Sequence, residues 1–554
     1  MHDDQGWRWP RIAASALVAS ICTALAAAPL QIAVAAIIGP AALILIARRA
    51  RRASHAVIWV AVMQIPLWLW LERWVGPIAH AGWVAMAIYM TAWPVAFCLL
   101  LRFVAAKGCL RRLPSAVLAP VLWVALECLR GIVIFDGYPW FLAGSSLVGM
   151  PLAQIADLGG VWLVSLLAIS ISGVLADWRS GDRSTAVAVL ALMMVAWGYG
   201  FWRLREEHSG ASTSVLIVQT NVPQTNKMVW TWEQQQQDVA EAISLTVTSP
   251  HLTEADVVVW PETMLPGAGF EVSMADFLPS PESFEALWSW SIVAEQLAAS
   301  IGRPLLVGTQ TWIDAAVQED GQRLRATFEQ QFNSAVLISP GASTSRYDKI
   351  FLTPIGERMP YLEYWPALGE WARQIAGTEM LFDLTASDEA TRLSLVRQDG
   401  TVASLATPIC FEDTVPWVCR ALCFESGDRA ADLLINLSND GWFGSVDAGR
   451  LQHVLEARMR CITNRTPMVR VANTGVSCLI DSEGAVHATG PTAKESPLMR
   501  SHGTWLVEAT SDDRQPIARF VGDGVAWFSL LGGILLVIAR LLPLCSEPES
   551  CSGE

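Results

Sequence analysis

The stretch "VVVWPETMLPG" (257–267) contains a short apolar run that stops at a proline, and an acidic residue, Glu262, follows directly. A run of β-branched residues is typical of a buried strand, and the proline marks its end. Similar runs recur along the chain with helical patterns between them, which predicts an α/β domain with helices packed on its sheets. The other runs are 214–219, 304–308, 334–338, 404–410, 432–438, 468–473 and 477–481, and the helical patterns are 231–247, 284–301 and 447–464.

Long apolar segments flank this α/β region on both sides. The chain is 53% hydrophobic and 16% charged, which is too apolar for an ordinary soluble protein. About 20 apolar residues cross a bilayer as a helix, so we expect a polytopic α-helical bundle of roughly eight spans. This predicts a membrane domain at 1–203, a globular domain at 204–519, and a last span with a short tail at 520–554. The expected spans are 11–28, 30–47, 55–75, 81–104, 115–134, 158–178, 185–203 and 522–542.

Clusters of basic residues predict how these spans are oriented. Arg8 and Arg11 precede the first span, and "ARRARR" (47–52) follows the second. If every span crosses the membrane, all the clusters fall on one side, which the positive-inside rule identifies as the cytoplasm. The globular domain is then expected on the opposite side, and the C-terminal tail in the cytoplasm. The remaining clusters are Arg102, Lys107, Arg111 and Arg112, followed by Arg179 and Arg183.

The charge and the cysteines exclude several classes of function. The net charge is −14, and no basic stripe stands out in the globular region, so we expect no nucleic-acid partner. The eleven cysteines show neither a zinc-site spacing nor a dense disulfide framework, and we expect no metal or cofactor. We interpret the cysteines other than Cys410 as packing residues. Pairing is left open among Cys419, Cys423, Cys461 and Cys478.

Three ionisable groups are predicted at strand ends, where α/β domains commonly carry their reactive residues. They are Glu262, Lys349 in "SRYDKIFLTPIGERMPY" (345–361) and Cys410 in "ATPICFEDTVPW" (406–417). Each alone is typical of a solvated loop or a packed core. As a set they form a catalytic group, because the carboxylate can take the thiol proton and the ammonium can stabilise a thiolate and an oxyanion. His453 lies in a helical pattern, and we expect it to pack.

These residues resemble the nitrilase, or carbon–nitrogen hydrolase, superfamily, whose Glu–Lys–Cys triad matches Glu262 in "WPE", Lys349 in "YDK" and Cys410 in "ICFE". With spans on both sides, the chain is similar to the membrane-embedded apolipoprotein N-acyltransferase family. The stretches "YPWFLAGSSLVGMPLAQIADLGGVWLVS" (138–165) and "SNDGWFG" (438–444) carry the same resemblance. It implies an αββα sandwich on the periplasmic side of a bacterial inner membrane.

The resemblance also implies a reaction. Cys410 would take an acyl chain from a phospholipid as a thioester, and the α-amino group of a diacylglyceryl-cysteine apolipoprotein would then accept it. Phe411 stands where tyrosine is common in relatives, but the aromatic ring is retained. The residues implied to orient or line the site are Glu357, Glu412 and Asn333. Phe411 is expected in the substrate pocket, and Trp442 and Phe443 are expected either to shape that pocket or to pack in the core.

Two other functions stay open at this point. A membrane-tethered amidase would use the same triad with water as the acceptor, because one fold hosts many reactions. A non-enzymatic scaffold or transporter would carry a degenerate domain, although the intact triad argues against it, and the spans contain few acids beyond Glu72 and Glu127. Two long inserts, 265–300 and 361–392, are expected either to reach toward lipid as apolar arms or to pack on the domain.

Overall fold

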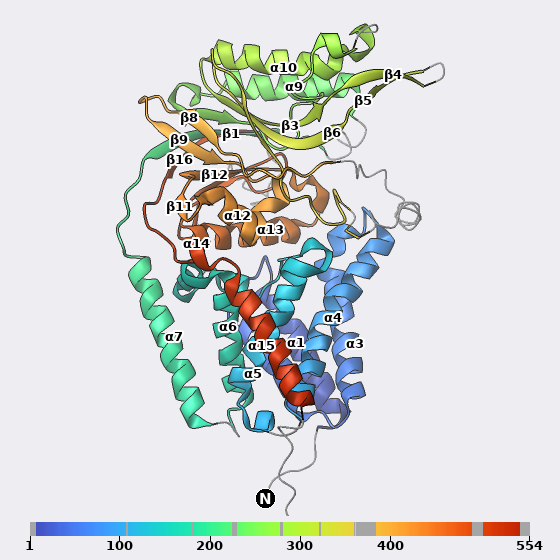
Figure 1. Cartoon of the computed structure of the whole chain (residues 1–554), viewed down its shortest axis with the longest axis vertical. Helices are drawn as coiled ribbons and strands as arrows, with labels where there is room; N and C mark the ends of the chain where they lie inside the picture. The colour runs from blue at the N-terminus through green and yellow to red at the C-terminus, as the bar shows by residue number, and fades with distance from the viewer. Residues whose placement is uncertain are drawn as a thin grey trace, which may run out of the picture. The chain divides into compact units, whose positions relative to one another are not determined.

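The computed structural model describes residues 7–542 apart from 107–108, 180–181, 224–229, 278–280, 321–322, 359, 362–383 and 490–501. Contacts divide the described residues into two compact units. The first comprises 7–206 and 521–542, and the second comprises 207–361 and 384–520. Each unit is described by itself below (Figure 1).

The first unit is a bundle of apolar helices. In the described part of the chain, seven helical segments are long and apolar enough to cross a membrane. The expected span 30–47 corresponds to α2, whose 15 residues reach only about 22 Å, short of a hydrocarbon core of about 30 Å. The expected count of eight spans therefore stays a prediction. The helices are α1 (Trp9–Ala26), α2 (Ala35–Arg49), α3 (Ala53–Leu71), α4 (His80–Val104), α5 (Ser115–Cys128), α6 (Ala156–Ala176), α7 (Arg183–Arg203) and α15 (Gly524–Leu541).

Small residues allow the helices of this bundle to pack closely against one another. Helix α5 packs on α6 and α15, and α3 packs on α4. A side chain at Gly173 in α6 would lie 2.4 Å from the backbone of Ala116 in α5, so only glycine permits this approach. The shared core includes Ile12, Leu43 and Phe97. Packing through small residues is the usual way in which helices associate in lipid.

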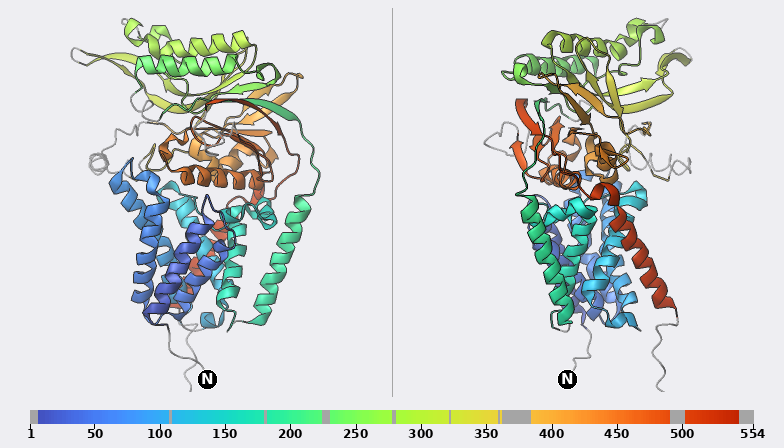
Figure 2. Two further views of the ribbon diagram at one scale, coloured as in Figure 1. Left: turned by 180° about the vertical axis from the view of Figure 1, so that it is seen from behind. Right: turned by 60° about the vertical axis from the view of Figure 1, so that its left-hand side comes forward.

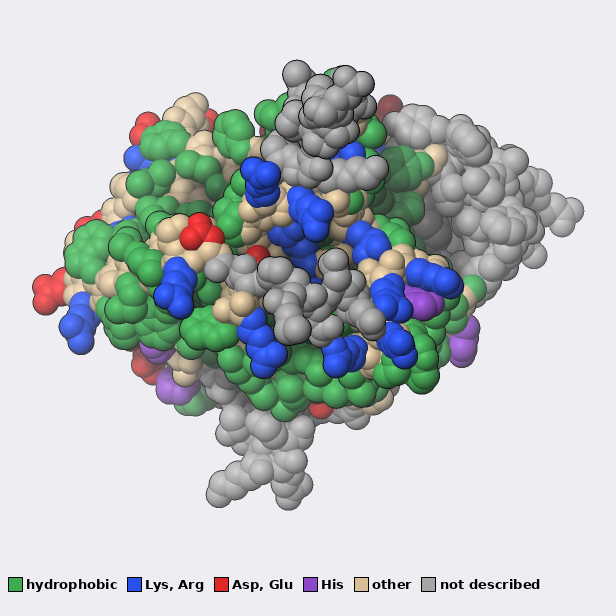
Figure 3. Space-filling model, turned by 90° about the horizontal axis from the view of Figure 1, so that it is seen from below, with side chains coloured by type: hydrophobic (Ala, Val, Ile, Leu, Met, Phe, Trp, Pro, Cys, Tyr) green, Lys and Arg blue, Asp and Glu red, His purple; other side chains and the backbone are tan. Residues whose placement is uncertain are grey.

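The helix ends that carry the basic clusters meet at one end of the bundle. Arg48 Nη2 donates to the carbonyl of Leu113 at 2.7 Å, and Arg102 Nη2 donates to that of Arg51 at 3.1 Å. Arginine side chains gather on the face seen in Figure 3. This grouping is what alternately crossing helices require, and the side of the membrane that this face meets stays a prediction. The exposed arginines at these helix ends are Arg8, Arg11, Arg49, Arg51, Arg52, Arg111, Arg112, Arg179 and Arg183.

The second unit contains two six-stranded sheets in its described residues. The first has the order β16-β1-β2-β3-β6-β7 and the second β15-β14-β13-β12-β9-β8. The first consists of β1 (Ser212–Gln219), β2 (Val257–Val259), β3 (Leu305–Ile313), β6 (Gln330–Ile338), β7 (Ser345–Asp348) and β16 (Gly503–Thr510). The second consists of β8 (Leu393–Val396), β9 (Val402–Ala406), β12 (Leu433–Ser438), β13 (Met468–Ala472), β14 (Cys478–Ile480) and β15 (Val486–Thr489). Two hairpins add β4 (Ala316–Asp320) with β5 (Arg323–Thr327), and β10 (Phe424–Glu425) with β11 (Asp428–Arg429).

Helices cover the outer faces of both sheets, which confirms the expected αββα sandwich (Figures 1 and 2). Helices α9 (Trp232–Val247) and α10 (Pro281–Ile301) cover the first sheet, and α12 (Pro416–Cys423) and α13 (Asp447–Asn464) cover the second. The short helix α14 (Ala518–Val521) follows β16. Trp290 of α10 joins the core between these two helices and the first sheet, so this part of the 265–300 insert packs on the domain. Most of the 361–392 insert lies outside the described residues.

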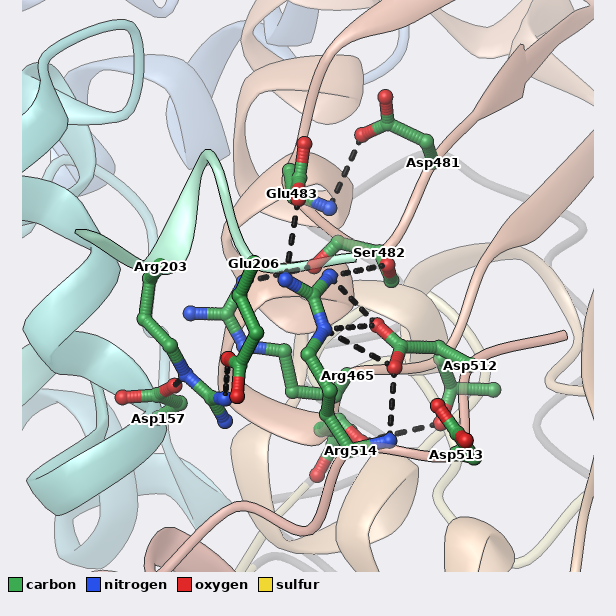
Figure 4. Close-up of polar contacts among 12 residues, drawn as sticks. Asp157, Arg203, Glu206, Arg465, Asp481, Ser482, Glu483, Asp512, Asp513 and Arg514 are labelled. Carbon is green, nitrogen blue, oxygen red and sulfur yellow. Dashed lines mark hydrogen bonds and ion pairs between the residues drawn. The ribbon is translucent and has the colours of Figure 1, made fainter. Parts of the chain in front are cut away.

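Buried ion pairs hold the ends of both units (Figure 4). In the first unit, Arg203 at the end of α7 pairs with Asp157 of α6, with 2.7 Å between Nε and Oδ2. In the second unit, Arg514 Nη2 lies 2.7 Å from Asp512 Oδ2, and Arg514 Nη1 lies 3.1 Å from Glu483 Oε1. Ion pairs of this kind hold irregular chain segments in place, because loss of one partner would leave the other as an unpaired buried charge, which is destabilising.

Candidate active site

Glu262 lies in the turn that follows β2, where Pro261 ends the strand. Its side chain is buried, and Oε1 accepts a hydrogen bond from Asn333 Nδ2 on β6 at 2.9 Å. The turn passes so close to β3 that a side chain at Gly308 would lie 2.7 Å from Glu262 Cα. The sheet therefore holds this carboxyl group from two neighbouring strands.

Lys349 follows β7 and is fully buried. Its backbone N–H donates to the carbonyl of Asn333 at 2.9 Å. The ammonium Nζ lies 2.9 Å from Glu357 Oε1 and 2.7 Å from Oε2, and the backbone N–H of Thr353 holds that carboxylate at 2.8 Å. Burial lowers the pKa of Lys349, but the attraction of Glu357 and the other nearby anionic groups outweighs it and raises that pKa above its usual value. The lysine is therefore a fixed cation.

Cys410 lies just after β9, in a backbone conformation that is unusual for a residue with a side chain. Its φ is +53°, and it opens the short 3₁₀ turn Cys410–Thr414. Asn436 in the middle of β12 donates from Nδ2 to the carbonyls of Pro408 at 3.0 Å and Cys410 at 3.1 Å. A conformation of this kind persists only where its surroundings hold it, and it is common at reactive sites.

Glu412 joins the turn that carries Cys410 to the loop that carries Lys349. The carboxylate is fully buried and accepts hydrogen bonds at 2.7–3.0 Å from groups in both segments. Burial raises the pKa of Glu412 to about 7, although Lys349 and these donors oppose the shift. The donors are the backbone N–H groups of Ile350, Phe351 and Ile409 and the hydroxyl of Tyr347.

The structure brings the three predicted groups together. The Cys410 thiol and the Glu262 carboxyl interact and shift each other's pKa, and Lys349 interacts electrostatically with both. Burial and the negative charge of Glu262 raise the pKa of Cys410, and Lys349 opposes that rise. The thiol therefore keeps its proton at rest, beside a carboxylate that can remove it. This arrangement suits nucleophilic attack assisted by a base.

The expected pocket residues divide between two environments. Phe411 is buried and stacks on Phe351, with 6.2 Å between ring centroids. Phe443 is also buried and packs edge-on against the His453 ring, so core packing describes it better. Trp442 is partly exposed. Asn333 and Glu357 contact each other and members of the triad, with Asn333 Nδ2 at 3.4 Å from Glu357 Oε1.

Sequence reasoning missed two features of this site. Asn436 is a polar residue inside the apolar run "LLINLS" (433–438), and that interruption is the signal that could have identified it. His453 was expected to pack in its helix, but it contacts two buried carboxylates, and a spacing pattern cannot show such contacts. Eight cysteines in the described part of the chain are free thiols, including Cys419, Cys423, Cys461 and Cys478.

Two family models match the chain. The model of the apolipoprotein N-acyltransferase N-terminal domain matches residues 19–174, and the carbon–nitrogen hydrolase model matches residues 216–501. The first covers most of the helical bundle, and the second covers about half of the whole chain. The order of these matches agrees with the two units of the structure.

Curated relatives match across both regions. An apolipoprotein N-acyltransferase of Geobacter metallireducens is 28% identical over 83% of this chain and 80% of its own length. Those of Caulobacter vibrioides and Azotobacter vinelandii are each 30% identical, over 74% and 70% of this chain and 71% and 67% of their own lengths. A solved amidase from Nesterenkonia sp. is 14% identical, with a TM-score of 0.34, and the match covers 56% of this chain and 95% of that one.

Proposed function

Because this chain belongs to the apolipoprotein N-acyltransferase family, we propose that it moves an acyl chain from a phospholipid to the α-amino group of an apolipoprotein. The acceptor is the N-terminal diacylglyceryl-cysteine, so the reaction is the last step of bacterial lipoprotein maturation. The protein is an acyltransferase and a multi-pass bacterial membrane protein. We assign it to the inner membrane, with the second unit on the periplasmic side, from the basic residues at the helix ends.

In the first half of the reaction, Cys410 becomes acylated. Glu262 accepts the thiol proton as the sulfur attacks the carbonyl carbon of a phospholipid ester. The Lys349 ammonium stabilises the negative charge that develops on the carbonyl oxygen. The ester C–O bond then breaks, Glu262 returns the proton to the departing lysophospholipid oxygen, and a thioester remains on Cys410.

In the second half, the lipoprotein amine takes the acyl chain. The neutral α-amino nitrogen attacks the thioester carbon, and Glu262 accepts a proton from that nitrogen. The C–S bond breaks, the sulfur recovers the proton from Glu262, and the product is an amide. Water must be kept from the thioester during this interval, because its attack would waste the acyl chain by hydrolysis.

The observation that carries this proposal is the contact of a thiol, a carboxyl group and a buried ammonium in one place. The interaction between Cys410 and Glu262 supports proton transfer, and the Lys349–Glu357 pair supports a cation that keeps its charge throughout the cycle. Glu357 and Glu412 act in this scheme by holding the lysine and the Cys410 turn in place.

Replacing Lys349 by alanine should slow acylation by about 10²–10³-fold, because the oxyanion loses its charged donor. The rate is measured as thioester formation on Cys410 after rapid mixing with phospholipid. The change also strands the Glu357 carboxylate, so the double variant Lys349→Ala/Glu357→Ala is the matched control. If the double variant recovers the wild-type rate, the stranded carboxylate caused the loss and the oxyanion role is wrong.

The proposed reaction is tested by mass spectrometry of a lipoprotein N-terminus from cells with and without this protein. We expect an N-acylated terminus only in cells that contain it. An equally acylated terminus in both would contradict the transfer. If purified protein releases free fatty acid but acylates no amine, water is the acceptor and the chain is a hydrolase.

A further inference from the structure

A buried charged cluster lies directly behind the turn that carries Cys410. It consists of Asp413, Asp440, His453 and Arg470, each at most 2% exposed. The four residues come from four different segments, namely the Cys410–Thr414 turn, the Asp440–Phe443 turn, α13 and β13. The triad does not include any of them.

His453 bridges the two acidic residues of this cluster. Its Nε2 lies 2.8 Å from Asp413 Oδ1, and its Nδ1 lies 3.0 Å from Asp440 Oδ1. Arg470 also binds Asp413, and its Nη2 lies 3.6 Å from Asp440 Oδ2. Each ring nitrogen of the histidine therefore has its own carboxylate.

Hydrogen-bond chemistry determines the protonation of this bridge. Arg470 contacts both carboxylates, which favours their ionised form. An ionised carboxylate only accepts hydrogen bonds, so beside two of them both nitrogens of His453 donate and the ring carries two protons. Two cations then face two anions, and the cluster is neutral. A neutral imidazole would leave one unbalanced negative charge in a place without solvent, which is costly.

The bridge connects two turns that surround the proposed site. Asp413 is three residues from Cys410 in the same 3₁₀ turn, and Asp440 begins the turn that contains Trp442. A side chain at Gly475, where φ is +141°, would lie 2.3 Å from Asp440 Oδ2, so the backbone also closes on this carboxylate. The positive φ of Cys410 requires such support.

We propose that His453 is a positioning residue, which as a doubly protonated bridge sets the distance between the Cys410 turn and the Asp440–Phe443 turn. It acts through Asp413 and Asp440 and does not touch the substrate. This inference rests on the proposed function for the role of Cys410. The geometry of the bridge itself does not depend on which acyl group is transferred.

His453→Gln should lower the rate of Cys410 acylation by about 10–100-fold, because a small misplacement of a reacting group costs this much. The apparent affinity for phospholipid should change by less than about twofold, since the bridge does not contact the substrate. The exposed His251, changed to glutamine, is the matched control and should keep the wild-type rate. A folded His453→Gln protein that acylates at the wild-type rate would overturn the proposal.

A comparison of the acylation rates of Asp440→Asn and Asp440→Ala distinguishes a hydrogen-bonded bridge from simple packing of the side chain. The asparagine amide can donate to Nδ1, so the bridge survives with a single ring proton, and we expect most of the rate to remain. The alanine removes the bridge, and its rate should fall to that of His453→Gln. Equal rates for the two variants would contradict the bridge.

Imidazole ¹⁵N spectra of the detergent-solubilised full chain give a readout that needs no substrate. The signal that disappears in His453→Gln should show protons on both nitrogens in the wild type and on Nε2 alone in Asp440→Asn. A singly protonated His453 in the wild type would overturn the proposal. Alkylation of Cys410 by iodoacetamide also needs no lipid, so a slower reaction in His453→Gln would support positioning even if the transferase proposal fails.

Discussion

Changing Cys410 to alanine should abolish formation of the acyl-enzyme and lower turnover by about 10⁴–10⁶-fold, because the reacting sulfur is removed. The thiol is the atom that receives the acyl chain, and the contacts of Asn436 and Glu412 hold its turn without using the sulfur. The alanine protein should therefore fold normally and bind phospholipid. Intact-protein mass spectrometry after incubation with phospholipid measures the adduct directly.

Two further variants make this result specific. Cys410→Ser keeps the size of the side chain but replaces the thiol with a hydroxyl, which is a far poorer nucleophile near neutral pH, so it should also be nearly inactive. Cys22→Ala in α1 removes a thiol from the helical bundle and should acylate at the wild-type rate. An adduct that persists in Cys410→Ala would place the reacting nucleophile elsewhere and end the proposed mechanism.

Glu262→Gln should have the next largest effect, a loss of about 10²–10⁴-fold in the acylation rate, which is the usual contribution of a general base. The amide oxygen of glutamine can still accept the hydrogen bond of Asn333 Nδ2, so the local geometry should survive. The amide cannot accept the proton of the Cys410 thiol. The decrease in the acylation rate of Glu262→Gln therefore measures the contribution of proton transfer to Glu262.

The pH dependence of acylation tests the same role. Burial raises the pKa of Glu262, and Glu357 adds to the rise, while Lys349 and the hydrogen bonds oppose it. A base must be ionised, so the wild-type rate should fall as the pH falls through this raised pKa, above the usual value of about 4.3. Glu262→Gln should lose this acidic limb, whereas the exposed Glu254→Gln should keep it. An unchanged limb in Glu262→Gln would assign the titration to another group.

Much of the fold was predictable because hydropathy and strand patterns are local properties. The predicted strand runs at 256–260 and 432–438 contain β2 and β12, and the predicted helical pattern 447–464 corresponds to α13. Edge strands were missed where the pattern was weak. Strand β16 contains no long apolar run, yet it pairs antiparallel with β1 along its whole length. Strand β8 alternates buried and exposed residues over only four positions. Their pairing depends on partners far away in the chain.

The positions of Glu262, Lys349 and Cys410 were also predictable, because each follows a break in an apolar run and carries a reactive group. The supporting residues were less accessible to this reasoning. Asn436 looks like a flaw in an apolar strand until its amide is seen to bind the carbonyl of Cys410. His453 looks like one polar residue of an amphipathic helix until its two carboxylate partners are in view.

By itself, the sequence determined the apolar helices, most strands and the candidate reactive groups, because each is encoded within a few neighbouring residues. Only the tertiary structure decided that the acid, the amine and the thiol meet. It also decided the positive φ of Cys410 and the bridge from Asp413 through His453 to Asp440. The two contacts of the bridge join residues that lie 13 and 40 positions apart, because hydrogen bonds and ion pairs depend on distance in space and not on distance along the chain.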